Sequence, residues 1–191
     1  MCSSDLAYVD FAVQDALPLL EPTRGLKNVL LLRSLSKGYS LAGLRFGYGI
    51  GHPNLIAALN KAKDSYPTDA LAQAAATAAV SNRNLAARTW RLVIDERQRL
   101  SRELAQRGFQ VSASQSNFIL GVPPPPAQSN HHAHYGNAKE IYESLKKQNI
   151  FVRYFDLDRL RDKLRITIGT PKQNDTLLAA LDHLRGQGIE R

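Results

Sequence analysis

The sequence predicts an α/β protein in two parts: a partial domain with a mostly parallel sheet and helices, and a smaller α+β domain at the C-terminal end. Residues 28–32 (NVLLL) form a short apolar run, which is typical of a strand buried in a parallel sheet. Residues 85–107 form a long helix pattern with apolar side chains on one side, and Gly108 follows as a helix end. Short strand-like and helix-like segments then alternate to the end of the chain, which indicates the second domain.

The elements before the long helix follow from periodicity and propensity. Apolar and polar side chains alternate over residues 8–13, so we expect a strand there. Residues 53–63 and 69–80 contain good helix formers and few β-branched residues, so each segment predicts a helix. The long helix itself is expected to bury Val93, Leu100 and Leu104.

The second domain is predicted to contain short strands and two helices. The strands are expected at residues 109–113, 118–122, 151–154 and 164–168, and the first helix at residues 138–148. The last helix has a well-marked start, because Thr170 suits the N-cap, Pro171 suits the first position and Gln173 completes a capping box. Its buried stripe is expected to consist of Leu177, Leu178, Leu181 and Leu184.

Residues 123–134 (PPPPAQSNHHAH) are predicted to be an exposed insertion. Four prolines followed by polar residues fit neither a helix nor a central strand. The insertion contains three histidines, His131, His132 and His134, which are metal-binding residue types. Because no carboxylate or cysteine lies near them in the sequence, we expect no metal site there.

Composition excludes several classes of protein. Apolar residues make up 43% of the chain and charged residues 22%, and no stretch approaches the about 18 apolar residues of a membrane span. The single Cys2 excludes an internal disulfide and a multi-cysteine metal site. Residues 1–11 lack the basic and apolar regions of a secretory signal, so we expect a cytoplasmic protein without a membrane partner.

The net charge of +8 permits binding to acidic partners or to phosphorylated small molecules. Much of the excess lies in residues 83–107, where opposite charges recur four residues apart, as in Arg99 with Glu103 and Glu103 with Arg107. That pattern is typical of a solvated helix face. Because no RNA-binding motif accompanies the arginines, we expect no nucleic-acid partner.

Residues 33–48 (RSLSKGYSLAGLRFGY) contain the side chains that are most suited to binding and catalysis. Ser34 and Ser36 precede Lys37, and Arg45 follows eight residues after the lysine. Two hydroxyls, a turn and an arginine suit one phosphate, and a lysine amine beside that phosphate can form an imine with an aldehyde. The cofactor that carries both groups is pyridoxal 5'-phosphate (PLP). The spacing alone, however, favours an interpretation of Lys37 and Arg45 as ordinary loop cations.

This segment resembles the Ser-x-Ser-Lys-x-x-x-x-x-Gly-x-Arg-x-Gly signature of class I/II aminotransferases of fold type I. The signature is filled without a gap by Ser36, Lys37, Gly43, Arg45 and Gly47. Further segments resemble the histidinol-phosphate branch of that family, namely SLAGLRFGY (40–48), DSYPTDALAQAAA (64–76), SNF (116–118) and LRITIGTPKQND (164–175). The resemblance implies a PLP-dependent enzyme that uses an amino donor and a 2-oxo acid and that works as a homodimer.

The resemblance also implies roles for single residues near the cofactor. Lys37 matches the lysine that holds PLP through its side-chain amine and moves the proton from the substrate α-carbon to the cofactor. Ser34, Ser36 and Arg45 match the residues that bind the cofactor phosphate. Tyr8 matches the tyrosine whose hydroxyl contacts the oxygen on the cofactor ring.

Asp5 stands where the family has the aspartate that keeps the pyridine nitrogen protonated. The family motif reads Asp-Glu-x-Tyr, whereas this chain has Leu6 in place of the glutamate. Residues 1–6 also match the translated end of a sequencing-library adapter, so we expect these six residues to be an artefact and not part of the natural sequence. Asp5 is therefore a candidate by spacing alone.

Two arginines of the second domain match substrate-binding positions of the family. Arg165 resembles the arginine that binds the substrate α-carboxylate, a role that suits a planar bidentate donor. Arg153 resembles a second arginine near the far end of the substrate, where histidinol phosphate carries its phosphate. Asn117 resembles an asparagine that opens the small domain, and we interpret it as structural.

The resemblance gives the predicted domain boundaries. Residues 1–82 are the C-terminal part of the PLP-binding large domain, residues 83–107 a connecting helix and residues 108–191 the small domain. Because members of the family have a further half before this part, we expect the chain alone to be poorly stable and inactive, with open sheet edges.

Other functions share the same cofactor residues and remain open at this point. An aminotransferase for aromatic or other amino acids and a threonine-phosphate decarboxylase differ only in substrate-binding positions. A non-enzymatic PLP-binding regulatory module is a more distant alternative, which fits the basic charge but for which the sequence contains no helix-turn-helix.

Overall fold

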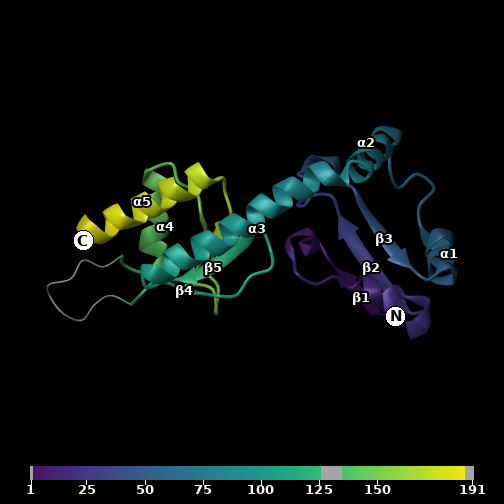
Figure 1. Cartoon of the computed structure of the whole chain (residues 1–191), viewed down its shortest axis with the longest axis horizontal. Coiled ribbons are helices and arrows are strands. Elements are labelled where there is room, and N and C mark those ends of the chain that lie inside the picture. The colour runs from purple at the N-terminus through teal and green to yellow at the C-terminus, as the bar shows by residue number, and fades with distance from the viewer. Residues whose placement is uncertain (1, 126–134, 188–191) are drawn as a thin grey trace. The chain divides into compact units, whose positions relative to one another are not determined.

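The computed structural model describes residues 2–125 and 135–187, with the backbone alone for residues 2–5 and 186–187 (Figure 1). The chain divides into two compact units, residues 1–91 and 92–191, and the boundary lies inside helix α3 (Arg83–Gln106). The histidines of the predicted insertion lie outside the described residues. None of the described helices has the length and apolar character that crossing a membrane requires.

The first unit is built on a three-stranded sheet with the order β1-β2-β3. The strands are β1 (Cys2–Asp5), β2 (Val29–Ser34) and β3 (Gly47–Gly51). β1 pairs in parallel with β2, and β2 pairs in an antiparallel manner with β3. The apolar run therefore forms the central strand as predicted, with one parallel and one antiparallel neighbour.

The expected strand over residues 8–13 is wrong, because Val9–Phe11 forms a short 3-10 helix instead. The amide of Phe11 donates to the carbonyl of Tyr8 at 3.0 Å, and this turn buries the Phe11 side chain. Three further 3-10 turns follow in this unit, at Leu17–Leu20, Pro22–Arg24 and Ala42–Leu44. The alternating side chains of this segment thus belong to a turn that buries the Phe11 ring, and the segment does not pair as a strand.

Both predicted helices of the first unit are present. They are α1 (Pro53–Ala62) and α2 (Ala70–Ser81). The side chain of Asp69 accepts a hydrogen bond from the amide of Ala72 at 2.8 Å, which fixes the start of α2. The expected helix starts at this cap, and its end differs from the observed end by one residue.

The second unit contains a four-stranded antiparallel sheet with the order β4-β5-β7-β6. Its strands are β4 (Gln110–Val111), β5 (Phe118–Val122), β6 (Arg153–Tyr154) and β7 (Leu164–Thr167). Its helices besides α3 are α4 (Ala138–Lys147) and α5 (Pro171–Gln187). The expected elements are therefore present, although β4 and β6 are shorter than predicted.

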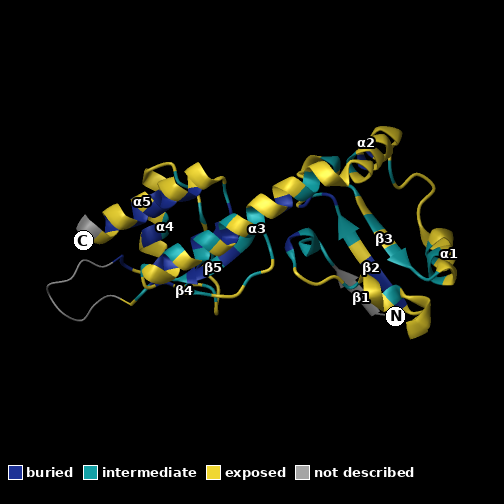
Figure 2. Ribbon diagram, in the orientation of Figure 1, coloured by how far each residue is buried: buried dark blue, intermediate teal, exposed yellow. Residues whose placement is uncertain are grey.

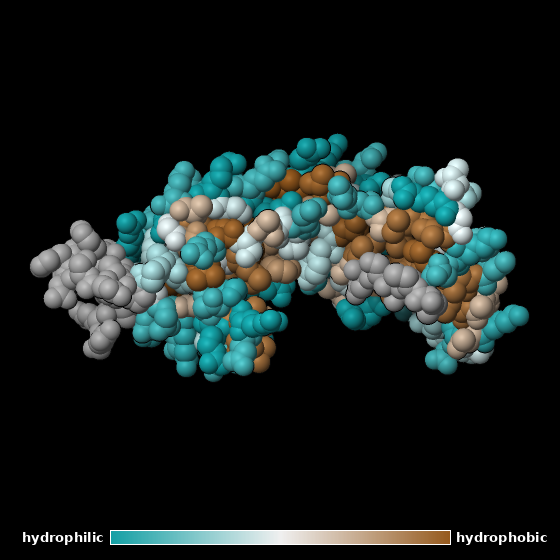
Figure 3. Space-filling model, turned by 90° about the horizontal axis from the view of Figure 1, so that it is seen from below, coloured by the Kyte–Doolittle hydropathy of each residue, from teal (hydrophilic) through white to brown (hydrophobic). Residues whose placement is uncertain are grey.

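The second unit has a continuous hydrophobic core, whereas the first unit leaves much apolar surface exposed (Figures 2 and 3). In α3, Leu100 and Leu104 are fully buried. The predicted stripe of α5 is buried as well, through Leu177, Leu178, Leu181 and Leu184. Exposed large apolar side chains of the first unit include Val13, Leu17, Leu19, Leu26 and Leu32. The second unit alone thus has the packing of a complete small domain.

The predicted solvated face of α3 is only partly solvated. Glu103 pairs with Arg107 at 2.7 Å as the spacing predicts. Arg107 also pairs with Asp182 of α5 at 2.8 Å, and Arg99 pairs with Asp175 of α5 at 2.8 Å. Both arginines therefore connect α5 to α3. The four-residue charge spacing within α3 does not predict these contacts.

The capping box of α5 gives the first testable prediction. The amide of Thr170 donates to Oε1 of Gln173 at 2.9 Å, and the Gln173 amide donates back to Oγ1 of Thr170 at 3.4 Å. Thr170→Ala removes this cap, so we expect the free energy of unfolding of the second unit to fall by about 1 kcal/mol in urea denaturation. Thr176→Ala, in the interior of the same helix, is the control and is expected to have no destabilising effect, because alanine is the better helix former. Equal losses in the two variants would contradict the role of the cap.

Candidate active site

The predicted cofactor residues of the first unit meet at one edge of its sheet. Because β1 and β2 are parallel, their carboxyl ends lie at the same edge, and Asp5 and Ser34 are the last residues of these two strands. β3 is antiparallel to β2, so its first residue, Gly47, lies opposite Ser34. Lys37 follows the end of β2 and Arg45 precedes the start of β3. In open α/β sheets, ligands bind outside the carboxyl ends of the strands, which is where this edge lies.

The hydroxyls of Ser34 and Ser36 form a joined pair. Oγ of Ser34 donates to Oγ of Ser36 at 2.8 Å, and the amide of Ser36 donates to Oγ of Ser34 at 3.1 Å. Both side chains are half-buried. Two hydroxyls held this close can donate to oxygens of the same anion.

Lys37 begins a tight turn. Its carbonyl accepts a hydrogen bond from the amide of Ser40 at 3.2 Å, and the amide of Leu41 donates to the carbonyl of Leu35 at 3.1 Å. The side chain of Leu35 is fully buried, whereas the side chain of Lys37 is exposed. The buried Leu35 thus anchors the turn, and the Lys37 side chain is exposed.

Arg45 has a backbone conformation that is uncommon for arginine. Its φ of 54° and ψ of 35° lie in the left-handed region, and its Nη1 donates to the carbonyl of Ala42 at 2.9 Å. Arg45 is otherwise exposed. At Gly47, an added Cβ would lie 2.8 Å from the backbone oxygen of Arg33, so the close approach of β2 and β3 requires glycine there.

Tyr8 and Asp5 lie on the segment that leaves β1. Tyr8 is half-buried and directly precedes the 3-10 helix Val9–Phe11. The backbone of Asp5 pairs with that of Leu32, and the side chain of Asp5 is not among those described. The predicted roles of both residues, and the predicted origin of residues 1–6, stay predictions.

The two predicted substrate arginines lie side by side in the second unit. Arg153 of β6 is directly opposite Arg165 of β7. The guanidinium of Arg165 lies 4.0 Å from the ring centre of Phe118, and that of Arg153 lies 5.3 Å from the ring centre of Phe155. A depression of about 380 Å³ is lined by Phe151, Val152, Arg153, Phe155, Arg165 and Thr167.

The pairing of two arginines has an electrostatic consequence. Like charges directly opposite each other destabilise a pair of strands unless an anion lies between them. Nε of Arg165 is buried and has no hydrogen-bond partner in the described part of the chain. This buried donor and the facing positive charges fit an anionic ligand in the depression.

Sequence reasoning missed an ion cluster around Arg33, the residue directly before Ser34. Arg33, at the end of β2, pairs with Asp15 at 2.5 Å and lies 3.9 Å from Asp10. Burial raises the pKa of Asp10, and the positive charge of Arg33 opposes that shift in part. Burial acts in the same direction on the pKa of Asp15, but the hydrogen bond and charge of Arg33, together with backbone hydrogen bonds at Leu17 and Ala16, outweigh burial and lower the pKa overall. The only signal in the sequence was the position of Arg33 at the start of the RSLSK segment.

Metal-ligating side chains are not clustered in residues 2–125 and 135–187. These ranges contain no group of three or more histidine, cysteine, aspartate or glutamate side chains that could hold a metal ion. The predicted cofactor groups at the sheet edge are hydroxyls, an amine and a guanidinium, which suit an anionic organic cofactor.

Asn117, interpreted above as structural, accepts a backbone hydrogen bond from the amide of Ile168 at 2.9 Å through its carbonyl.

Comparison with known proteins identifies the family. The model of the family described as aminotransferase class I and II matches residues 1–181. Histidinol-phosphate aminotransferase 1 of Nostoc sp. is 47% identical over 180 residues, which are 94% of this chain and 47% of that protein. The histidinol-phosphate aminotransferase of Gluconacetobacter diazotrophicus is 42% identical over 93% of this chain and 47% of its own length. The chain thus spans about half the length of the curated relatives it matches.

Solved structures agree with the sequence comparison. The histidinol-phosphate aminotransferase of Sinorhizobium meliloti, solved in complex with pyridoxal-5'-phosphate, matches with a TM-score of 0.76 and 29% identity over 96% of this chain and 48% of that chain. The enzyme of Clostridium acetobutylicum matches with a TM-score of 0.78 and 25% identity over 96% of this chain and 54% of that chain. These matches confirm the predicted fold class. Because the family model covers almost the whole chain, and because the signature residues around Lys37 meet at one sheet edge, this chain belongs to the class I and II aminotransferase family.

Proposed function

We propose that this chain is the Lys37-bearing part of a PLP-dependent aminotransferase of histidine biosynthesis. The proposed reaction moves the amino group of L-histidinol phosphate to 2-oxoglutarate and gives imidazole acetol phosphate and L-glutamate. The observation that carries the proposal is the meeting of Ser34, Ser36, Lys37 and Arg45 at the carboxyl edge of the sheet, in a chain 47% identical to a histidinol-phosphate aminotransferase. We include in the proposal a homodimeric, cytoplasmic enzyme, as is usual for this family.

The residues at the sheet edge fit PLP by their chemistry. The joined hydroxyls of Ser34 and Ser36 and the guanidinium of Arg45 are donors for a phosphate, and the outward amine of Lys37 suits an aldehyde. When bound, PLP supplies that aldehyde and a ring that withdraws electrons from the substrate α-carbon. Lys37 would then have two tasks: its amine would hold the cofactor at the aldehyde carbon, and once the substrate amine has displaced it, the freed amine would take the proton from the substrate α-carbon and return it at the former aldehyde carbon.

The arginine pair gives the second unit a role in substrate binding. Arg165 offers two parallel N–H groups to a carboxylate, and its stacking on Phe118 fixes the plane of these groups. Arg153 places a second positive charge beside it, which suits a substrate with two anionic ends, such as histidinol phosphate or 2-oxoglutarate. The names of the most similar relatives favour histidinol phosphate over the substrates of the alternatives.

The function is tested by locating the lysine that reacts with PLP. The protein to use is the completed enzyme, in which the amino-terminal half of the Nostoc relative precedes this chain from Ala7 onward. After incubation with PLP and reduction with borohydride, peptide mapping is expected to find one adduct, at Lys37. Adducts scattered over exposed lysines such as Lys61 and Lys63, without preference for Lys37, would contradict the proposal.

Arg165→Lys is expected to raise the KM of the completed enzyme for 2-oxoglutarate about a hundredfold. Lysine keeps the positive charge but loses the planar, bidentate contact and the stacking on Phe118. Steady-state kinetics with varied 2-oxoglutarate measure the effect. Arg161→Lys is the matched control, since the Arg161 side chain is 62% exposed and pairs with Asp158 at 2.7 Å. An unchanged KM in Arg165→Lys would remove Arg165 from the proposed site.

A further inference from the structure

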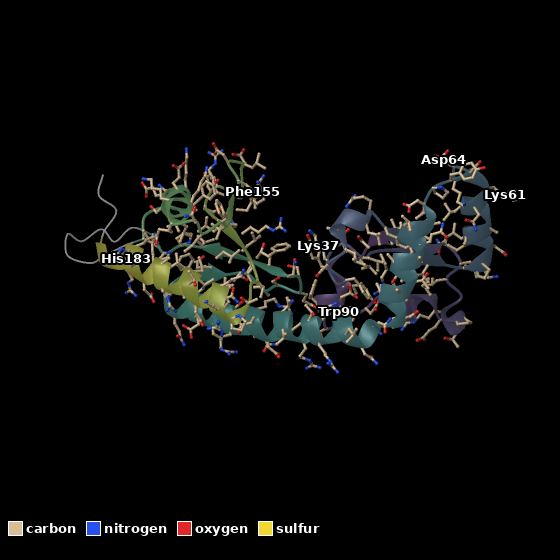
Figure 4. All side chains as sticks on the ribbon, turned by 90° about the horizontal axis from the view of Figure 1, so that it is seen from above. Lys37, Lys61, Asp64, Trp90, Phe155 and His183 are labelled. Atoms are coloured by element: carbon tan, nitrogen blue, oxygen red, sulfur yellow. The ribbon has the colours of Figure 1, made fainter. Side chains whose placement is uncertain are left out.

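Trp90 makes a long-range contact with the turn that carries Lys37. It lies in the part of α3 that belongs to the first unit, and only 6% of the residue is exposed. Its indole N–H donates a hydrogen bond to the backbone carbonyl of Gly38, the residue directly after Lys37. Figure 4 shows Trp90 beside the segment that bears Lys37, whereas Lys61 lies at the other end of the same unit.

The other side of Gly38 is occupied by Asp10. A Cβ atom at Gly38 would overlap the Asp10 carboxylate, so no side chain fits there unless Asp10 moves. Asp10 is in turn held near Arg33, at 3.9 Å. Gly38 is therefore enclosed between a carboxylate on one side and an indole N–H on the other. We name Asp10, Gly38 and Trp90 the Gly38 clamp.

The ring of Trp90 is itself fixed from two directions. The edge of the Tyr39 ring packs on it, with ring centres 5.4 Å apart and planes at 83°. The guanidinium of Arg83 lies 5.3 Å from its ring centre. A buried ring with these contacts presents its N–H in one direction, so the hydrogen bond to Gly38 defines the position of that carbonyl.

The clamp matters for Lys37 because of how the lysine is held. Its side chain is exposed, so the direction of its amine depends on the backbone turn from Lys37 to Ser40. The Gly38 carbonyl belongs to the second residue of that turn. If this carbonyl loses its hydrogen bond from Trp90, the peptide that joins Gly38 to Tyr39 can change its orientation, and the turn can sample other conformations.

We propose that Trp90 is a positioning residue for Lys37, which acts through its hydrogen bond to the Gly38 carbonyl. This proposal rests on the proposed function, because it concerns the placement of the lysine that holds PLP. Trp90 does not touch the reacting atoms. Its role is to keep the turn in one conformation, so that the amine of Lys37 meets the cofactor aldehyde in a fixed place.

The first measurement needs no cofactor. Trp90→Phe keeps an aromatic ring against Tyr39 and Arg83 but removes the N–H donor. In the completed enzyme without PLP, we expect hydrogen exchange at the amides of Ser40 and Leu41 to become about fivefold to tenfold faster, the factor that one lost hydrogen bond is worth. Exchange at the amide of Ile168, which bonds to Asn117 in the second unit, is expected to stay unchanged.

The matched control is Leu31→Val in the same unit. Leu31 is fully buried in the central strand, so its truncation lowers the stability of the unit without removing a bond to the turn. If Trp90 has only a structural role, the two variants will show equal exchange at Ser40 and Leu41 when compared at equal loss of unfolding free energy. That result would overturn the proposal.

The second measurement separates this proposal from the proposed function. The ratio of PLP adduct on Lys37 to adduct on Lys61 after brief borohydride trapping is expected to fall about tenfold in Trp90→Phe and to stay constant in Leu31→Val. If PLP attaches selectively to Lys37 in the protein without a substitution, and Trp90→Phe gives the same ratio, the positioning role is wrong and the aminotransferase function stands. If the unmodified protein shows no preference for Lys37, the proposed function is wrong, while the exchange at Ser40 and Leu41 still decides whether the clamp holds the turn.

Discussion

Replacing Lys37 by arginine is expected to abolish borohydride-stable attachment of PLP at this position and to lower amino transfer by the completed enzyme at least about a thousandfold. Arginine keeps the positive charge, but its guanidinium stays protonated and cannot take up the α-proton. The measurements are peptide mapping, the rate of glutamate formation and the exchange of the substrate α-proton with solvent. We expect PLP attachment, glutamate formation and α-proton exchange to be lost together, because one amine performs the attachment and the proton transfer.

Lys61→Arg is the control for this experiment. Lys61 lies on α1, in the same unit and in an exposed position, and it is expected to have no part in the reaction. Full activity in Lys37→Arg would contradict the assignment of the signature lysine. Loss of glutamate formation with normal exchange of the α-proton would instead show that another group is the base.

Leu104→Ala is expected to lower the free energy of unfolding of the second unit by about 2–5 kcal/mol. Leu104 is fully buried where α3 packs into the hydrophobic core of this unit, so its truncation leaves a cavity. Urea denaturation followed by circular dichroism measures the loss. Leu157→Ala makes the same chemical change at a residue that is 58% exposed, and it is expected to change stability by less than about 0.5 kcal/mol.

A small loss in Leu104→Ala would indicate that the core rearranges to fill the cavity. A similar loss in both leucine variants would show that exposure does not decide the effect, which would contradict the described core. The comparison also separates stability from chemistry, because neither leucine belongs to the candidate site.

Elements with local signals could be predicted from the sequence. The start of α5 is fixed by Thr170, Pro171 and Gln173, which are close neighbours in the chain, and the structure shows the expected hydrogen bonds. Gly108 follows the end of α3 with a φ of 86°, a conformation that glycine adopts without strain. Propensity, capping and helix periodicity act over a few residues, so a single sequence contains them.

Elements that depend on the rest of the unit could not be predicted in this way. The alternation over residues 8–13 fits a strand, but the burial of Phe11 favours a 3-10 turn. The contact of Trp90 with Gly38 joins residues far apart in the chain and leaves no pattern in either segment. The residue types of the signature indicated the candidate site, and the strand pairing then showed that they share one edge.

The left-handed backbone of Arg45 sets stability against function at one position. A non-glycine residue in that region costs about 1–2 kcal/mol relative to glycine, which adopts it freely. Arg45→Gly would relieve the backbone and at the same time remove the cation proposed to bind the phosphate. Natural selection for stability alone would therefore favour the loss of this side chain. The proposed contact with the phosphate gives a functional reason to keep arginine here, so a stabilisation programme should leave Arg45 untouched.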